Sequence, residues 1–329
     1  MVVGSLILLA ALIVVSISAV WLVPEPIPFG VVVKSIWSHL TGHSTSTAIQ
    51  DTIVWQIRLP RVLLAIIVGM LLSTAGAALQ GLLHNPLADP YIVGVSSGAA
   101  LGASVAIVFG LSGILYSFGI PLVAFVFAMA AMLVVYSLAR YSGRVSIQSF
   151  LLAGVVVGSF LWALLTFVLT LAGRDVATII RWLLGSLDSP NPWAYVVMTL
   201  PFALIGIVVL LAMARDLNIF SLGEETARHM GIETENLKLI IILTTSFITA
   251  AAVSASGIIG FVGLMMPHVS RRVFGSDHRV LIPTAALLGA ILLVLADAAA
   301  RALGEMPIGV ITAILGAPFF LYLLRKQPR

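Results

Sequence analysis

Long stretches without a formal charge recur along the whole chain, and they constrain its fold more than any other feature. The segments 91–139 and 239–270 contain no Asp, Glu, Lys or Arg. Overall, 60% of the 329 residues are hydrophobic and only 9% are charged, against about 25% charged residues in soluble domains. A water-soluble enzyme is thereby excluded. We predict an all-α polytopic membrane protein, because each transmembrane helix needs about 20 apolar residues.

Prolines, glycines and charges divide these stretches into about ten predicted spans. The first is interpreted as a span and not as a signal peptide, because it lacks a basic start and a cleavage site. The spans are Val2–Val23, Val62–Gly81, two within Tyr91–Ala139 separated by 110–121, Gln148–Ala172, Pro192–Ala214, two within Leu239–Ser270 separated near Gly257 with the second ending near Pro267-His268, Val280–Ala296 and Ile308–Leu324. The remaining connections are short, so residues 1–329 are predicted to form a single transmembrane domain.

The distribution of Lys and Arg predicts that both termini lie inside the cell, because inner connections carry an excess of these residues. With the N-terminus inside, the inner basic residues are Arg140, Arg144, Arg215, Arg228, Lys238, Arg271, Arg272, Arg279, Arg325, Lys326 and Arg329. The outer ones are Lys34, Arg58, Arg61, Arg174, Arg181 and Arg301. The ratio is about two to one, and the net charge of +4 is explained by topology without nucleic-acid binding.

Two small-residue segments suggest an internal repeat. Ser97–Ala103 in the third span resembles Pro283–Ala290 in the ninth. Spans 2–5 and 7–10 would then be two related halves, a plan that many transporters use. Two helices rich in Ala and Gly could also produce this similarity without any common origin.

The chain lacks the residues that would let it use an energy source by itself. It has no cysteine, no phosphate-binding loop, no HExxH motif and no GxSxG motif. The one acidic residue near a span is Asp297, and Arg301 four residues later predicts a local ion pair. Ion-coupled transport usually needs ionisable groups inside the spans, so the energy is expected to come from another polypeptide.

The inner connection after the sixth span has an unusual pattern. Ser221-Leu222-Gly223-Glu224 predicts a capping box that starts a short helix, and Gly231 is a favoured residue just beyond a helix end. The helix is too short to bury Leu222, Ala227 and Met230 in a core of its own. It is either a surface helix on the ends of the spans or a rigid docking element for a cytoplasmic partner.

From Val54 to the C-terminus the chain resembles a known family, the FecCD/BtuC-like permeases of type II ABC importers for cobalamin, ferric siderophores and haem. Each motif is weak alone, but their order over most of the chain is specific. They are Arg58-Leu59-Pro60-Arg61, Gln80-Gly81, Asn85-Pro86-Leu87-Ala88-Asp89-Pro90, Gly94-Val95-Ser96-Ser97-Gly98-Ala99, Glu225-Thr226-Ala227-Arg228-His229-Met230-Gly231, Gly260-Phe261-Val262-Gly263-Leu264, Pro267-His268 and Gly316-Ala317-Pro318-Phe319-Phe320.

The resemblance implies a homodimeric permease, not itself an enzyme, in the inner membrane of a prokaryotic cell. Two copies of an ABC ATPase subunit would bind MgATP, and a periplasmic or lipid-anchored binding protein would deliver the substrate; this chain would bind no metal or cofactor. Residues 217–233 would be its cytoplasmic coupling helices. The implied ATPase contacts are Ser221, Gly223, Glu224, Ala227, Arg228, Met230 and Gly231.

The resemblance also gives roles to outer arginines. Arg58, Arg61 and Arg301 match family positions that face glutamates of the binding protein. Arginine suits this role because its planar guanidinium binds a carboxylate through two hydrogen bonds and stays charged. The alternative is anchoring at the membrane interface, or, for Arg301, the ion pair with Asp297.

The implied translocation pathway follows the fifth and tenth spans on the dimer axis, with an inner gate at the start of the fifth. Taken alone, the small residues of these spans favour close helix packing. The implied gate and pathway residues are Ser146, Ile147, Gln148, Ser149, Gly154, Gly158, Gly309, Thr312 and Gly316.

The substrate within this class cannot be read from the residues. His39 and His43 could contact haem iron or a chelate, although two histidines in a loop rich in Ser and Thr are more often only solvated. Arg174 and Arg181 could attract an anionic chelate, or only anchor the chain near Trp182 at the membrane interface. The alternative functions are an ion-gradient-driven secondary transporter and an intramembrane enzyme acting on lipid. The former lacks buried acids and the latter a nucleophile with its base.

Overall fold

The computed structural model describes residues 2–42, 49–111, 118–141 and 144–326, which are mainly helical. Each predicted span corresponds to one helix of 13 or more residues. These helices are α1 (Val2–Leu22), α4 (Leu59–Leu82), α5 (Val95–Val108), α6 (Gly119–Ala139), α7 (Ile147–Leu171), α9 (Pro192–Ala212), α12 (Thr234–Ser256), α13 (Val262–Phe274), α14 (His278–Ala302) and α15 (Ile308–Lys326). The shorter elements are α2 (Phe29–Leu40), α3 (Ile49–Thr52), η1 (Ile53–Arg58), η2 (Pro90–Val93), η4 (Gly173–Asp175), α8 (Val176–Leu183), α10 (Ala214–Phe220), α11 (Glu224–His229) and the antiparallel strands β1 (Arg140–Tyr141) and β2 (Arg144–Val145).

The lengths of these helices support a multi-pass membrane protein. Within the described residues, seven helices are long and apolar enough to cross a membrane. The helices α5 and α15 are apolar but shorter, and α13 has only 13 residues. The total of about ten spans therefore stays a prediction, since a full crossing takes about 20 residues.

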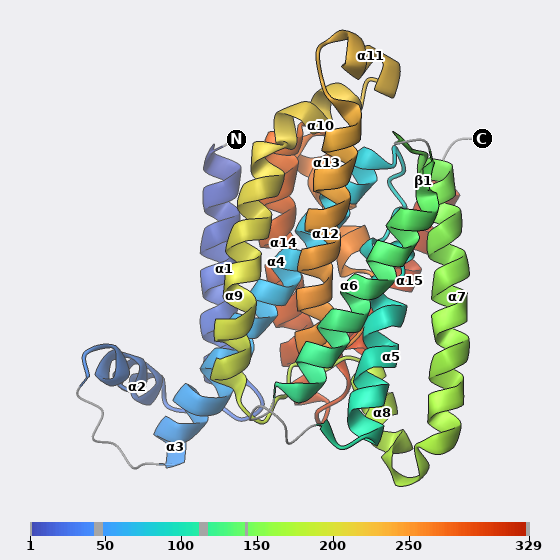
Figure 1. Cartoon of the computed structure of the whole chain (residues 1–329). Helices are drawn as coiled ribbons and strands as arrows, with labels where there is room; N and C mark the ends of the chain where they lie inside the picture. The colour runs from blue at the N-terminus through green and yellow to red at the C-terminus, as the bar shows by residue number, and fades with distance from the viewer. Residues whose placement is uncertain (1, 43–48, 112–117, 142–143, 327–329) are drawn as a thin grey trace.

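The two ends of the helical bundle carry different elements (Figure 1). The start of α1, the end of α15, the helices α10 and α11, and the hairpin β1–β2 lie at one end. The helices α2, α3 and α8 lie at the opposite end. The sequence assigned these two groups to opposite sides of the membrane, and the arrangement agrees with that separation. Which end faces the cytoplasm stays a prediction.

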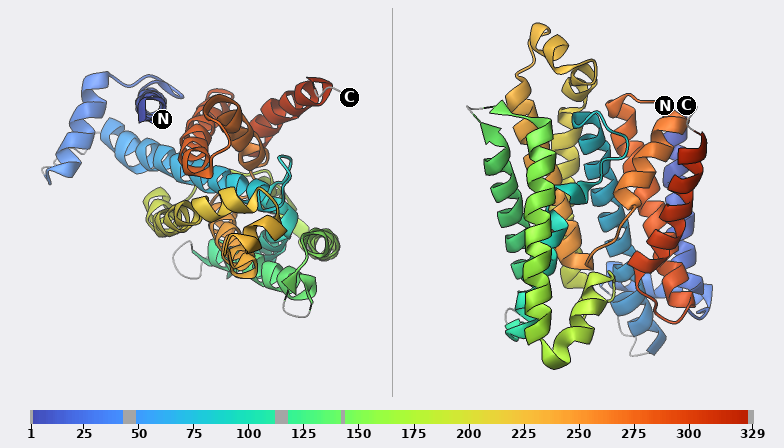
Figure 2. Two further views of the ribbon diagram at one scale, coloured as in Figure 1. Left: turned by 90° about the horizontal axis from the view of Figure 1, so that it is seen from above. Right: turned by 90° about the vertical axis from the view of Figure 1, so that its right-hand side faces the viewer.

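The centre of the bundle is the contact between α4 and α14. Seen along the bundle, α4 crosses the middle while α7 and α15 lie at the periphery (Figure 2). A Cβ atom added to Gly69 of α4 would lie 2.3 Å from the carbonyl oxygen of Gly289 in α14. Only glycine permits this approach. Inside a membrane the hydrophobic effect does not hold helices together, so close packing of their backbones does.

The packing has the arrangement expected of two related halves. The first helix of each set of four packs against the third helix of the other set, as α4 does with α14 and α12 with α6. The small-residue similarity that suggested the repeat joins α5 with α14, however, which are not equivalent in this arrangement. In both helices the glycines serve close packing: Gly98 and Gly102 contact α6, and Gly289 contacts α4. A shared packing requirement explains that similarity.

Several helices extend beyond their predicted spans: α12 begins at Thr234 instead of Leu239, and α14 continues to Ala302 instead of Ala296. Two further differences involve proline. The chain is helical from Ile49 to Leu82, so Arg58 and Arg61 lie within a helix and not in a polar connection. The π-helical turn Ile53–Arg58 directly precedes Pro60, whose ring nitrogen cannot donate to the preceding turn.

The second difference concerns α13, which continues through Pro267 to Phe274 instead of ending there. Pro267 has no N–H for the carbonyl of Gly263, four residues earlier. That carbonyl faces Gly76, where an added Cβ atom would lie 1.7 Å from the oxygen. The helix therefore continues through the proline at a place where it packs closely against a glycine of α4.

Candidate functional site

The segment predicted as the partner-docking element forms two short helices, α10 and α11, that project beyond the end of the bundle (Figure 1). The predicted capping box is wrong. Ser221 ends α10, with its hydroxyl donating to the carbonyl oxygen of Leu217 at 2.8 Å. Gly223, at φ +115°, precedes α11 without a side-chain cap. Ser221 is used by the helix before it, because α10 continues further than the sequence pattern indicated.

The end of α11 agrees with the prediction. The helix stops at His229, and Gly231 has a φ of +84°, a conformation that favours glycine. Leu222 and Met230 are 67% and 58% exposed, whereas Ala227 is fully buried. Large exposed apolar side chains at the end of a projecting helix are typical of a protein interaction site. Ala227 packs inside instead, so it is not open to a partner in this structure.

The predicted gate segment begins at the hairpin β1–β2 of the same end. Ser146 is the N-cap of α7, and its hydroxyl accepts from the backbone N–H of Ser149 at 3.4 Å. Ile147 is half-buried, while Gln148 and Ser149 are exposed. Their position at a helix start is therefore settled, and their role as a gate stays a prediction.

The small residues of α7 and α15 mainly pack against neighbouring backbone. Added Cβ atoms at Gly154 and Gly309 would lie 2.3 Å and 2.4 Å from the carbonyl oxygens of Ile92 and Leu184. At Gly316 the added atom would meet the ring of Phe261. Thr312 is buried, and Gly158 has an ordinary contact at 3.6 Å. Close packing is confirmed at Gly154, Gly309 and Gly316, and the pathway role stays a prediction.

The three outer arginines predicted to bind a partner are buried. Arg58 donates to the carbonyl oxygens of Val20 and Glu25, at 3.0 Å and 2.8 Å. Arg301 donates to the carbonyl oxygens of Val23 and Ala19. These contacts hold the end of α1 against η1 and α14. Docking through these arginines stays a prediction.

Asp297 is fully buried between two of these arginines. Its carboxylate lies 2.8 Å from Arg61 and 3.0 Å from Arg301, so the predicted pair four residues apart is confirmed. Arg61 also binds Glu305 at 2.9 Å. Sequence alone indicates neither the burial nor the Arg61 contact, because Arg61 and Asp297 are 236 positions apart in the chain.

Two of the other outer candidates, Arg181 and His39, have ordinary partners, and Arg174 is exposed. Arg181 lies 3.5 Å from Asp188, and both side chains are mostly exposed. The ring of His39 stacks on Trp55, with ring centres 4.3 Å apart. His43 lies outside the described residues. Among the residues described, no group of three or more His, Cys, Asp or Glu side chains could hold a metal ion.

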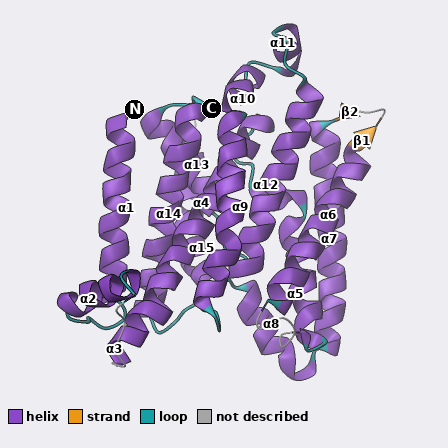
Figure 3. Cartoon of the chain, turned by 60° about the vertical axis from the view of Figure 1, so that its left-hand side comes forward, coloured by secondary structure: helices purple, strands orange, loops and turns teal. Residues whose placement is uncertain are grey.

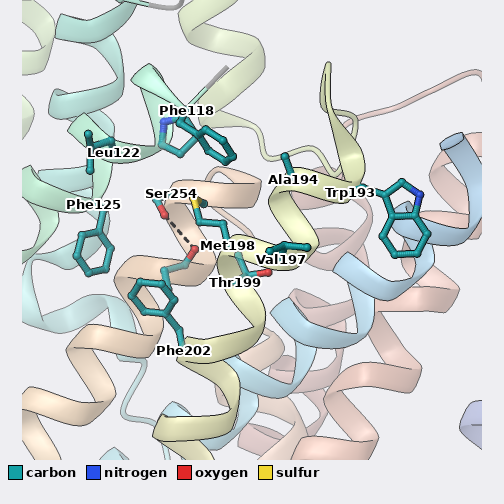
Figure 4. Close-up of a pocket in the computed structure, with 12 residues that line it drawn as sticks. Phe118, Leu122, Phe125, Trp193, Ala194, Val197, Met198, Thr199, Phe202 and Ser254 are labelled. Carbon is teal, nitrogen blue, oxygen red and sulfur yellow. Dashed lines mark hydrogen bonds between the residues drawn. The ribbon is translucent and has the colours of Figure 1, made fainter. Parts of the chain in front are cut away.

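An apolar pocket of about 670 Å³ lies between α6, α9 and α12 (Figure 4). Phe118, Phe125, Val197 and Phe202 are among its lining residues. The hydroxyl of Ser254 donates to the carbonyl oxygen of Ala251 at 3.0 Å, so its proton is already used within α12. None of the predicted pathway residues lines this pocket.

A polar cavity of similar size lies beside the projecting segment. Its lining includes His84, Asn218, Leu222, Arg271 and Asp277, from α4 through the start of α14. The backbone N–H of Arg279 and the amide of Asn218 hydrogen-bond the Asp277 carboxylate, which lowers the pKa of Asp277. The end of the bundle that carries α11 thus also offers a hollow, charged surface.

Comparisons with known proteins agree with this architecture. A family model described as the FecCD transport family matches residues 2–326. The cobalamin import system permease protein BtuC of Halobacterium salinarum is 45% identical over 278 residues, covering 84% of this chain and 74% of the relative. The hemin transport system permease protein HmuU of Yersinia pestis is 39% identical over 298 residues, covering 88% of both chains. A solved structure described as a metal-chelate type ABC transporter, in an inward-facing conformation, has a TM-score of 0.84, 30% identity and 98% coverage of both chains.

Proposed function

Since this chain belongs to the FecCD transport family, we propose that it is the permease subunit of an ATP-driven importer for a metal chelate or cobalamin. The observation that carries the proposal is the match to this family over residues 2–326. The projecting helix α11, with Leu222 and Met230 exposed, supports it by supplying a docking element. The relatives named above import cobalamin and hemin, and the substrate of this chain lies within that range of bulky chelates.

The proposed assembly contains two copies of this chain, two ATPase subunits and one substrate-binding protein. The permease crosses the inner membrane of a prokaryotic cell about ten times, with both termini inside. Closure of the ATPase subunits on MgATP moves α10 and α11. This movement switches α7 and α15 between outward-open and inward-open arrangements, and the binding protein delivers solute directly into the cavity between the two copies.

A secondary transporter driven by an ion gradient is less well supported. Its coupling site would need a buried acid that can exchange an ion. The buried Asp297 is held by Arg61 at 2.8 Å and Arg301 at 3.0 Å. Both cationic partners belong to this chain, so the contacts of the carboxylate mark it as part of a structural ion-pair cluster.

The proposal is tested by isolating the chain from its native membranes in mild detergent and measuring MgATP hydrolysis in the eluate. We expect an ATPase subunit to co-purify with the chain in a one-to-one ratio, and a substrate-binding protein to raise its rate of ATP hydrolysis. Met230→Asp places a charge on the exposed end of α11 and should release the ATPase. The control is Leu303→Asp, the same charge at an apolar residue 62% exposed at the opposite end of the bundle, which should leave the ATPase bound. Recovery of the chain alone, without ATPase activity, contradicts the proposal.

A further inference from the structure

Lys238 joins three elements at the end of the bundle that carries α11. Its ammonium nitrogen lies 2.8 Å from a carboxylate oxygen of Glu224 in α11 and 3.0 Å from one of Glu235 in α12. It also donates to the carbonyl oxygen of Val145 in β2 at 3.1 Å. The Lys238 side chain is only 4% exposed, although Lys238 lies near the polar start of the long apolar helix α12. A buried ammonium is stable only when its hydrogen bonds are made.

Val145 is held through both of its backbone polar groups. Besides the bond from Lys238 to its carbonyl, its N–H donates to the second carboxylate oxygen of Glu235 at 2.8 Å. The next residue, Ser146, is the N-cap of α7. Two side chains of α12 therefore fix the residue that immediately precedes the predicted gate.

The other side of the cluster fixes α11. The Glu224 oxygen that contacts Lys238 also accepts from Arg228, and Thr234 lies 3.5 Å from it. Two carboxylates and two cations thus balance their charges. If α11 moves relative to α12, either the bond between Lys238 and Glu224 breaks or the hairpin moves as well.

The arrangement of the elements suits such a link. The upper end of α12 lies between α11 and the hairpin (Figure 3), and α12 contacts both elements. The backbone offers no short route from α11 to the start of α7, because the whole of α7, α8 and α9 lies between them in the sequence. Side-chain contacts are therefore the short route between them.

We propose that Lys238 is a positioning residue that transmits movement of α11 to the start of α7. This inference rests on the proposed function, because the movement originates in the ATPase. If Lys238 had only a structural role, replacing it would lower the stability of the permease and change nothing else. The transmitting role predicts something more: without the Lys238 contacts, α11 still follows the ATPase, but the start of α7 no longer responds.

The absence of cysteine from the whole sequence allows both ends of the link to be followed with single thiols. Glu225→Cys places a thiol on the exposed face of α11, and Ser149→Cys places one on the exposed start of α7. Each is reacted with a membrane-impermeant maleimide in the permease–ATPase complex, without nucleotide and after trapping with MgATP and vanadate. We expect the ATPase to protect the first thiol and nucleotide to change the labelling rate of the second.

Lys238→Met is expected to abolish the nucleotide-dependent change at position 149 while protection at position 225 remains. Glu235→Gln tests the same link with less loss of packing. Its matched control is Glu233→Gln, the same charge change two residues away on an exposed side chain that does not contact Lys238. Either Lys238→Met or, where that variant does not assemble, Glu235→Gln decides the outcome.

An unchanged nucleotide response at position 149 in the deciding variant overturns the role of Lys238 and leaves the importer proposal intact. Equal loss of the response in Glu233→Gln also overturns it. Lack of protection at position 225 in the otherwise unchanged chain contradicts the importer proposal instead. The two failures are thus distinguished by which thiol reports them.

Discussion

The two ends of this molecule use the same kinds of charged residue in different ways. At the end with α2 and α8, Asp297, Arg61 and Arg301 are buried, with side chains at most 7% exposed. At the end with α11, Glu224, Arg228 and Glu235 are between 30% and 44% exposed, and Lys238 alone is buried. Burial decides what such a cluster can do.

The difference follows from the cost of separating charges in each place. Breaking one partner out of a fully buried ion pair leaves an uncompensated charge, which costs about 3–5 kcal/mol. Pairs open to water are worth about 0–1 kcal/mol, because water replaces the lost partner. The Asp297 cluster therefore fastens α1, α4 and α14 together. The Lys238 cluster lies at a partly hydrated surface, where α11 and the hairpin can move together at a lower cost in free energy.

The largest expected effect is at Asp297. Asp297→Ala leaves Arg61 and Arg301 without their shared carboxylate, and we expect a loss of about 3–5 kcal/mol in the free energy of unfolding. Thermal unfolding in detergent measures it. Glu305→Gln is the control, since Glu305 is 50% exposed and pairs with the same Arg61; its effect should be about 0–1 kcal/mol. Equal losses in the two variants would remove the contrast between the ends.

The next effect concerns the α4–α14 contact between the two ends. Gly69→Val introduces atoms where an added Cβ would lie 2.3 Å from the carbonyl oxygen of Gly289, so we expect a loss of about 1–3 kcal/mol or more. Gly158→Ala is the control, because its added atom has only a contact at 3.6 Å. A melting temperature unchanged in Gly69→Val would show that the central contact can yield.

At the α11 end we expect Lys238→Met to reduce unfolding stability by about 1–2 kcal/mol, since hydrogen bonds to a charged group are lost. The loss is smaller than at Asp297 because Glu224 and Glu235 remain about one third exposed and hydrated. The same unfolding measurement compares the two variants directly. A larger loss in Lys238→Met than in Asp297→Ala would reverse the assignment of fixed and adaptable ends.

The smallest effect is expected at an exposed ion pair. Arg181 and Asp188 are 67% and 57% exposed at a separation of 3.5 Å, so Arg181→Ala should change stability by less than about 1 kcal/mol. Adding salt should reduce this difference further, because salt screens exposed charges. A loss comparable to that of Asp297→Ala would show that exposure does not separate the two kinds of cluster.

The sequence predicted the helices better than their ends. Uncharged stretches located every long helix, because apolar length is local information. The sequence analysis placed Arg58 and Arg61 in a connection between spans, because a π-helical turn next to Pro60 has no simple sequence pattern. The helix α13 continues through Pro267, where it packs closely against Gly76 of another helix. Such tertiary contacts leave no local signal in the sequence.

The candidate site was predicted in place but not in detail. Residues Ser221–Gly231 marked the projecting segment, although Ser221 caps α10 and not α11. Lys238 was interpreted only as a topological charge. Its spacing from Glu235 was the one local signal of a pair. Its contacts to Glu224 and Val145 join residues 14 and 93 positions away, which no periodicity reveals.

The energy source is the central claim, and uptake into vesicles tests it most directly. The permease, its co-purifying ATPase and its binding protein are reconstituted, and cobalamin, haemin and ferric citrate are each supplied outside. We predict that uptake of one of them requires MgATP on the side of α11 and continues when an ionophore collapses all ion gradients. Uptake that proceeds without ATP and stops with the ionophore would contradict the account.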